Sequence, residues 1–221
     1  MFKCKICLSD IDLNLCKKLK TGGMFFHMDL VRYKCPICGV IFGDLNIINL
    51  TENQLKDKYI EVSKFYHDGD LSIYEIPVFE KLNPQKDKIY LNYASGEFSS
   101  TSDKLRNMGF NVYSYEPHIS VNDNEFVLKD IDSLLKYRFD GIFSHNALEH
   151  FQDPIKEMKL MKSILKENGC VLHSTPCFNY LYEQSEFHLY FYLDKSPEYL
   201  AKNSGFNKVE KIQDDEYLFK I

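Results

Sequence analysis

Apolar residues recur at two spacings along the chain, and the spacing changes at about residue 85. Before that point they lie three or four residues apart, which predicts amphipathic helices over residues 51–66 and 73–82. Thr51 is suited to cap the first of these helices, and Pro84 predicts the end of the second. After that point short β-rich runs alternate with stretches of helical spacing, which is typical of a parallel sheet with helices on its faces.

The alternating part predicts an α/β fold with a doubly wound, mostly parallel, Rossmann-like sheet. Helices are expected over residues 99–108 and 153–165. Strands are expected over residues 88–93, 111–115, 126–128, 139–144 and 170–174. Ligands of such sheets bind at the carboxyl ends of the strands, so the residues that follow each strand are the first candidates for a site.

Residues suited to a nucleoside follow the first three of these strands. The turn at residues 94–96 has small side chains, which let the backbone approach a ligand closely. Glu116 ends the second strand, and its carboxylate can accept hydrogen bonds from both hydroxyls of a ribose. Asp130 follows the third strand and can accept from an exocyclic amine, and Ile131 beside it offers an apolar contact for an aromatic ring. Together these residues predict a nucleoside pocket.

Composition narrows the class of protein. The chain has 221 residues and is 44% hydrophobic, which suits one ordinary domain or a domain with a small module. Its net charge of −5 disfavours binding of long nucleic acid by bulk charge. Because charges interrupt every apolar stretch well before the roughly 20 residues of a membrane span, we expect a cytoplasmic protein without a membrane partner.

The cysteines gather near the amino terminus in two Cys-x-x-Cys pairs. In a reducing compartment this clustering predicts a metal site rather than disulfides. Four thiolates would close the coordination sphere of a zinc ion, which would then be structural rather than catalytic. Cys16 and His27 lie between the pairs and are alternative ligands, and four unliganded buried cysteines are the remaining alternative. The predicted zinc ligands are Cys4, Cys7, Cys35 and Cys38.

These observations predict two parts. Residues 1–45 are expected to form a zinc-ribbon module. Residues 46–221 are expected to form the second part, with amino-terminal helices over 46–84 and the Rossmann-like core over 85–221.

The order of the motifs in the core resembles that of class I methyltransferases, which use S-adenosylmethionine (SAM). The resemblance covers residues 85–212 and is most specific over residues 139–154, which read FDGIFSHNALEHFQDP. The glycine loop lies at residues 91–98, the ribose acid at 113–117 and the adenine acid at 128–132. The resemblance implies a SAM site that includes Asn92, Ala94, Gly96, Glu116, Asp130, Ile131 and Asn146.

The glycine loop departs from the family pattern. In one alignment Asn92 stands where the family has an acid and Ala94 where it has a glycine. In the other, shifted by two residues, Gly96 is the last glycine of the loop, and glycines are missing in both. Alanine permits close approach of a ligand if its φ stays negative, and asparagine can still accept a hydrogen bond. We expect a tolerated variant of the loop. The alternative is a non-catalytic, zinc-stabilised scaffold that has lost its cofactor.

Methyl transfer from a sulfonium is an in-line displacement, so the protein must align the acceptor and accept its proton. His188 and His150 are the candidate bases, because histidine titrates near the operating pH. The segment around His188 is similar to the one that sugar methyltransferases with an amino-terminal zinc module use for base and substrate contacts. For each histidine a half-buried structural role is the alternative, and Glu149 with His150 is a further candidate pair of metal ligands.

Relatives with a zinc module act on sugars or on ribosomal RNA. The acidic balance and a tyrosine-rich run favour a small-molecule acceptor, namely a sugar or nucleotide-linked sugar of surface polysaccharide synthesis. These tyrosines are Tyr180, Tyr182, Tyr190 and Tyr192. An RNA substrate is the alternative, and it would use the basic residues of the ribbon. These basic residues are Lys17, Lys18, Lys20, Arg32 and Lys34.

Overall fold

The computed structural model describes residues 1–66, 69–96, 99–117 and 124–221. Its largest element is a seven-stranded sheet with the order β12-β13-β10-β9-β6-β7-β8. The strands are β6 (Ile89–Tyr93), β7 (Asn111–Tyr115), β8 (Val127–Leu128), β9 (Phe139–His145), β10 (Leu165–Ser174), β12 (Lys208–Gln213) and β13 (Glu216–Lys220). The strands from β6 to β10 run parallel, and only β13 and β12 are antiparallel to their neighbours. The predicted α/β fold with a mostly parallel sheet is therefore confirmed.

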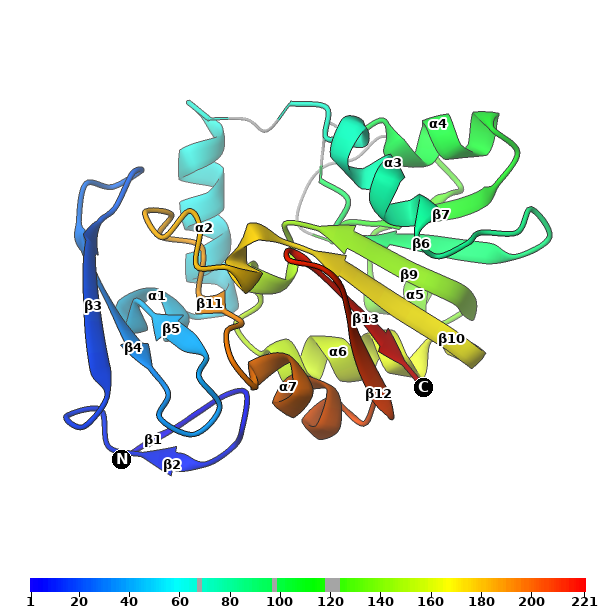
Figure 1. Cartoon of the computed structure of the whole chain (residues 1–221). Helices are drawn as coiled ribbons and strands as arrows, with labels where there is room; N and C mark the ends of the chain where they lie inside the picture. Colours follow the sequence, from blue (N-terminus) through cyan, green and yellow to red (C-terminus); the bar gives the residue numbers. More distant parts are fainter. Residues whose placement is uncertain (67–68, 97–98, 118–123) are drawn as a thin grey trace.

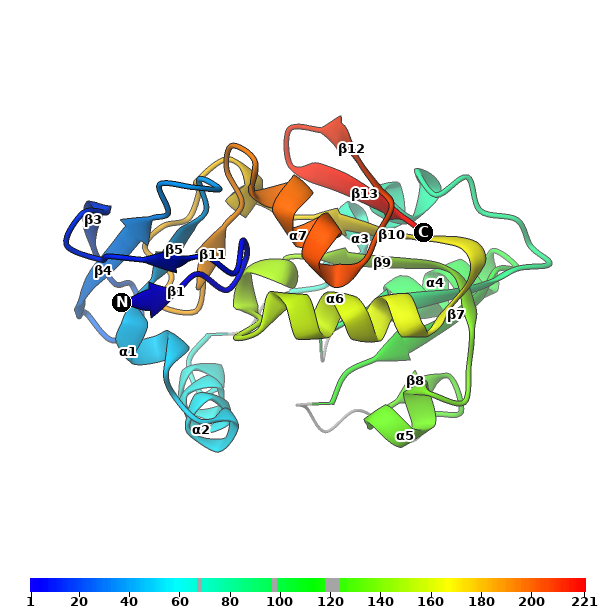
Figure 2. The same ribbon diagram turned by 90° about the horizontal axis from the view of Figure 1, so that it is seen from below.

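Helices cover both faces of this sheet (Figures 1 and 2). One face carries α3 (Ser72–Glu80) and α4 (Thr101–Asn107), and the other carries α6 (Pro154–Ser163) and α7 (Ser196–Ser204). The short α5 (Ile131–Leu134) follows β8. The central strands are apolar on both sides because helices cover both faces, and Leu91, Ile142 and Val171 are fully buried.

One predicted boundary is wrong. The helix expected over residues 153–165 ends at Ser163, and β10 begins at Leu165 rather than at Cys170. Leu165 pairs with Phe139 of β9, and the register then shifts before Cys170 pairs with Gly141. Asn168 and Gly169 therefore lie in an irregularity within a strand, whereas the sequence pattern placed them at the end of a helix.

The amino-terminal part is built on a second sheet with the order β11-β5-β4-β3. Its strands are β3 (Lys17–Gly22), β4 (Asp29–Lys34), β5 (Ile41–Gly43) and β11 (Tyr190–Phe191). The small pair β1 (Phe2–Lys3) and β2 (Asp10–Ile11) lies beside it, and α1 (Leu45–Ile48) follows β5. Since β11 comes from the carboxyl-terminal half of the chain, this sheet is completed by a segment far from residue 45 in the sequence.

The helix α2 (Glu52–Ser63) lies between the two sheets in Figure 1. It begins with a capping box, in which the Thr51 side chain accepts from the Gln54 backbone and the Gln54 side chain accepts from the Thr51 backbone. The predicted cap is thus confirmed, and it fixes the start of the helix that carries Tyr59 toward the site.

Candidate active site and zinc centre

The turn after β6 and the end of β7 meet at the carboxyl edge of the sheet. The backbone N–H of Gly96 donates to Glu116 Oε2 at 3.1 Å, and the N–H of Ser95 donates to the Tyr115 carbonyl at 3.3 Å. Glu116 is buried. The predicted convergence of the small-residue turn and the ribose acid is therefore present in the structure.

Ala94 does not keep the negative φ expected for an alanine in this loop. Its φ is +55°, in the left-handed region, and Gly96 has a φ of +72°. A side chain with a Cβ in this region costs roughly 1–2 kcal/mol, which the surrounding structure must offset. Backbone strain of this kind is concentrated at ligand sites, and it shows that the turn keeps a glycine-like shape without the glycine.

Two features of the turn fit a bound nucleoside cofactor. Asn92 is buried, and its side-chain amide donates to Glu75 Oε2 at 3.1 Å. Its Oδ1 has no hydrogen-bond partner within the described parts of the chain, so a buried acceptor remains for a ligand. A Cβ added at Gly96 would meet no described atom within 4 Å, so the space beside the turn is open.

The remaining residues predicted for the cofactor lie at the same edge of the sheet. Asp130 caps α5, with Oδ1 accepting from the Ser133 N–H at 2.6 Å, and this contact is the main cause that lowers the pKa of Asp130. Ile131 beside it is 48% exposed. Asn146 follows β9 with a φ of +50°, and its N–H donates to the Ser174 carbonyl. Residues 97 and 98 of the predicted loop lie outside the described residues.

Both predicted histidines lie together where the two parts of the chain meet. The rings of His150 and His188 are 5.0 Å apart, and the Tyr59 hydroxyl lies 3.2 Å from His150 Nδ1. Tyr59 comes from α2 and stacks on Phe187 at 4.3 Å. Tyr59 as a whole is 36% exposed, but burial of its hydroxyl raises its pKa, and the charges of Glu149 and Glu116 raise it further. The contacts with His150 and Phe187 place Tyr59 beside the histidine pair.

The environment of His188 weakens it as a base. Burial, followed by the neighbouring His150, lowers the pKa of His188 to about 3. Its Nδ1 lies 3.0 Å from the Tyr182 carbonyl, which only accepts, so Nδ1 carries the proton. His188 is neutral at pH 7, but its conjugate acid is too strong for efficient proton transfer at that pH.

Sequence reasoning named Glu149 as a candidate metal ligand and His188 as a candidate base, but it missed Cys177, which lies in one cluster with both. Glu149 and Cys177 are fully buried, and each lies with His188 in a group whose ligand atoms are within 4.8 Å of one another. Burial raises the pKa of Glu149 to about 7 and that of Cys177 well above its usual value. Cys177 follows β10 directly, so its place at a carboxyl strand end was the available signal.

Arg32 is not a surface residue of the ribbon, so its expected role in RNA contact is wrong. It is fully buried, and its Nη2 donates to the Ser185 carbonyl at 2.8 Å and to the His188 carbonyl at 3.4 Å. Burial lowers its pKa. Residues two apart on a strand face the same side, and Leu30 is also buried, so the alternation along β4 carried this signal.

Two of the four tyrosines expected to face a sugar are core residues. Tyr190 and Tyr192 are buried, and their hydroxyls donate to the carbonyls of Gln152 and Leu148. Tyr182, by contrast, is 68% exposed. An alternating aromatic pattern does not show which tyrosines are buried and which are exposed, because inward and outward positions alternate along an extended segment.

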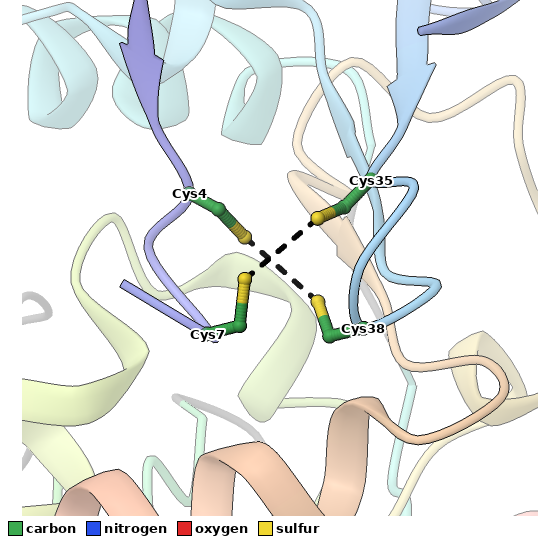
Figure 3. A group of neighbouring side chains, drawn as sticks. All are labelled: Cys4, Cys7, Cys35 and Cys38. Atoms are coloured by element: carbon green, nitrogen blue, oxygen red, sulfur yellow. Dashed lines mark hydrogen bonds between the residues drawn. The ribbon is translucent and has the colours of Figure 1, made fainter. Parts of the chain in front are cut away.

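The four predicted cysteine ligands meet in one group (Figure 3). Their sulfurs point to a common centre, with Cys4 Sγ 3.9 Å from Cys38 Sγ and Cys7 Sγ 3.8 Å from Cys35 Sγ. Sulfurs at the corners of a zinc tetrahedron with Zn–S bonds of about 2.3 Å lie about 3.8 Å apart. The group therefore fits a zinc ion.

The alternative ligands do not join this group. Cys16 is buried and donates its S–H to the Asp12 carbonyl, and His27 is exposed with a φ of +52°. Hydrogen bonds from Cys38 and Cys4 lower the pKa of the Cys35 thiol well below its usual range. Hydrogen bonds with Cys35 raise the pKa of the Cys4 and Cys38 thiols, so the case for a cation rests on the spacing of the four sulfurs.

Within the described parts of the chain, every helix is too short or too polar to cross a bilayer. A comparison with curated proteins finds no match to this chain. The family described as "Methyltransferase domain" matches residues 79–211, which is more than half of the chain.

Solved structures have the same core fold. A SAM-dependent methyltransferase from Archaeoglobus fulgidus is 14% identical with a TM-score of 0.50, over 69% of this chain and 76% of that one. Another from Thermotoga maritima is 14% identical with a TM-score of 0.50, over 77% of this chain and 98% of that one. Phosphoethanolamine N-methyltransferase 2 from Haemonchus contortus is 19% identical with a TM-score of 0.44, over 61% of this chain. The chain spans only 37% of the length of the Haemonchus enzyme.

Three findings point to the same fold: the family match over residues 79–211, the order of the strands in the sheet, and the turn beside Glu116. The chain belongs to the methyltransferase-domain family and has the fold of the class I, SAM-dependent enzymes.

Proposed function

We propose that the protein transfers the methyl group of SAM to a small polar acceptor, such as a sugar or a nucleotide-linked sugar. The observation that carries this proposal is the position of Tyr59 between two groups of residues. Its hydroxyl contacts His150, and the charges of Glu149, beside the histidines, and of Glu116, at the proposed cofactor edge, both raise its pKa. A methyl donor held at the edge of the sheet would therefore face an acceptor held between the two parts of the chain.

The turn at residues 94–96 and Glu116 would hold the adenosine half of SAM. Glu116 would accept from the ribose hydroxyls, and Asn92 Oδ1 would accept from another donor of the cofactor. SAM supplies an electrophilic methyl group on a sulfonium. The chain's own residues would bind it, exclude water and align the acceptor.

His150 is the proposed base. It lies at the contact with Tyr59, whereas the pKa of His188 at about 3 makes His188 a poor match to neutral pH. Removing a positioned base lowers a rate by about 10²–10⁴-fold. We expect His150→Ala to lower kcat by about that factor while the affinity for SAM stays within about twofold of the wild-type value.

The test is transfer of a radiolabelled methyl group from SAM to a panel of nucleotide-linked sugars and free sugars, with structured RNA as a separate substrate. Label in a sugar supports the proposal. Label in RNA alone would support the RNA alternative, for which the exposed Lys17, Lys18 and Lys20 on β3 remain available. Failure of SAM to bind would instead favour the non-catalytic scaffold.

We also propose that Cys4, Cys7, Cys35 and Cys38 hold a structural zinc ion. Sulfur spacings of 3.8 and 3.9 Å support a tetrahedral site, and four protein ligands would leave no position for substrate. Metal analysis of the purified wild-type chain tests this proposal, because it predicts zinc bound through these residues and is contradicted by a chain that folds without zinc.

A further inference from the structure

A second group of potential metal ligands includes one histidine of the pair, His188, with Glu149 and Cys177. Glu149 is on the short helix η1 (Leu148–His150), Cys177 is on η2 (Pro176–Phe178), and His188 comes just before β11. One ligand atom of each residue lies within 4.8 Å of the others. Carboxylate oxygen, thiolate sulfur and imidazole nitrogen are the atoms that bind zinc in proteins.

The buried carboxylate of Glu149 gives an independent indication that a cation fits this group. Its side chain is fully buried, and Oε1 accepts from the Thr175 hydroxyl at 2.6 Å. Its other oxygen, Oε2, has no hydrogen-bond partner among the described residues. An unpartnered carboxylate oxygen at such a depth is costly, and a cation would satisfy it.

The surrounding contacts orient the three side chains as metal ligands are usually oriented. The Thr175 hydroxyl that donates to Glu149 also accepts from the Cys177 N–H at 3.1 Å, so one residue positions two ligands. The Tyr182 carbonyl accepts from His188 Nδ1 at 3.0 Å, which leaves Nε2 unprotonated. Ligating histidines generally donate their other ring nitrogen to a carbonyl or carboxylate in this way.

We propose that Glu149, Cys177 and His188 form a second metal site, separate from the four amino-terminal cysteines, for one divalent cation of the zinc type. The carboxylate and the thiolate supply two negative charges, which face both such an ion and the buried guanidinium of Arg32 that donates to the His188 carbonyl. Three protein ligands leave one coordination position open, as in zinc sites that bind water or substrate. That this position takes a hydroxyl of the acceptor rests on the proposed function, but binding of the ion does not.

The test compares metal content in full-length variants. Each chain is equilibrated with Zn²⁺ and desalted, and its zinc is counted by plasma mass spectrometry. Cys177→Ser should bind one ion fewer per chain than the wild type, and Glu149→Gln and His188→Gln should each weaken binding at this site at least tenfold. Cys170→Ser is the matched control, because Cys170 is a partly buried cysteine outside both groups, and it should bind as many ions as the wild type.

A Co²⁺ titration gives a second reading without a substrate. The thiolate-to-cobalt absorption of the wild type should lose a one-thiolate component in Cys177→Ser and keep it in Cys170→Ser. Equal metal content and equal spectra in the wild type and in Cys177→Ser would overturn the proposal. If Cys177→Ser fails to fold, as judged by circular dichroism, the same comparison is made with His188→Gln. SAM binding, measured separately in each variant, keeps this result distinct from a failure of the proposed function.

Discussion

At the scale of single residues, Glu116 carries the cofactor assignment. Replacing it with alanine removes the carboxylate that accepts from the Gly96 N–H and that we propose as the acceptor for the ribose hydroxyls. We expect Glu116→Ala to weaken SAM binding by more than tenfold, or about 1.4 kcal/mol, in a calorimetric titration. Glu167→Ala is the control, since Glu167 is an exposed acid in the irregular part of β10. Unchanged affinity in Glu116→Ala would remove Glu116 from the pocket.

A second residue-scale prediction concerns acid stability. His173 is fully buried on β10, and burial lowers its pKa to about 3. A histidine in the unfolded chain titrates near about 6.5. As the pH falls from about 6.5 to 3, the unfolded chain gains a proton that the folded chain refuses, so the free energy of unfolding decreases. This contribution is fully present above about pH 6.5, and about 2 kcal/mol of it is lost by pH 5.

His173→Asn tests this prediction, because the amide keeps a polar atom for the contact with the Ser144 hydroxyl but does not titrate. The free energy of unfolding in urea should fall between pH 7 and pH 5 in both chains. The fall should be smaller in the variant than in the wild type by about 2 kcal/mol. Equal losses in the two chains would contradict the assignment of a neutral buried His173.

At the scale of elements, the turn between β3 and β4 is held to the segment that carries His188. Glu186 is fully buried and accepts from the backbone N–H groups of Phe25 and Phe26. We expect Glu186→Ala to lower the free energy of unfolding by about 2–4 kcal/mol, because two donors lose a charged acceptor. Glu183→Ala on the same segment is the control. A denaturation curve for Glu186→Ala that matches the wild type would contradict this role.

The proposed zinc ribbon and the β11 segment should depend on each other. β11 pairs with β5, which follows the Cys35 and Cys38 pair, so loss of the proposed zinc ion should release both. We expect Cys35→Ser to unfold the ribbon and lower solubility, with faster proteolysis in residues 1–45 and around 190. Cys16→Ser, at a buried cysteine outside the group, should keep the wild-type digestion pattern.

The features that could be predicted from the sequence are those that local sequence patterns determine. The helix begun by Thr51, the turn beside Glu116 and the four-cysteine group all follow from local spacing. The addition of β11 to the amino-terminal sheet did not follow, because pairing between distant segments leaves no local pattern. The alternation along β4 signals that Arg32 is buried, but its partners, like the cluster at Glu149, depend on the same contact between distant segments.

At the scale of the whole molecule, the two sheets contribute different parts of the proposed active site. The turn at residues 94–96, which we propose for the cofactor, lies at the carboxyl edge of the parallel sheet. The amino-terminal part, completed by β11, lies beside that edge in Figure 1. Tyr59, His150 and His188 all come from residues 46–221. Phe187 beside them contacts Phe25 and Phe26 of the amino-terminal part, so the proposed acceptor site lies where the two parts meet.

The most direct test of the account is a calorimetric titration of the wild-type chain with SAM and with its product, S-adenosylhomocysteine. We predict saturable binding at one site per chain for both molecules, and competition between them. Absence of heat and of any thermal shift at millimolar SAM would contradict the central claim that this fold binds the methyl donor.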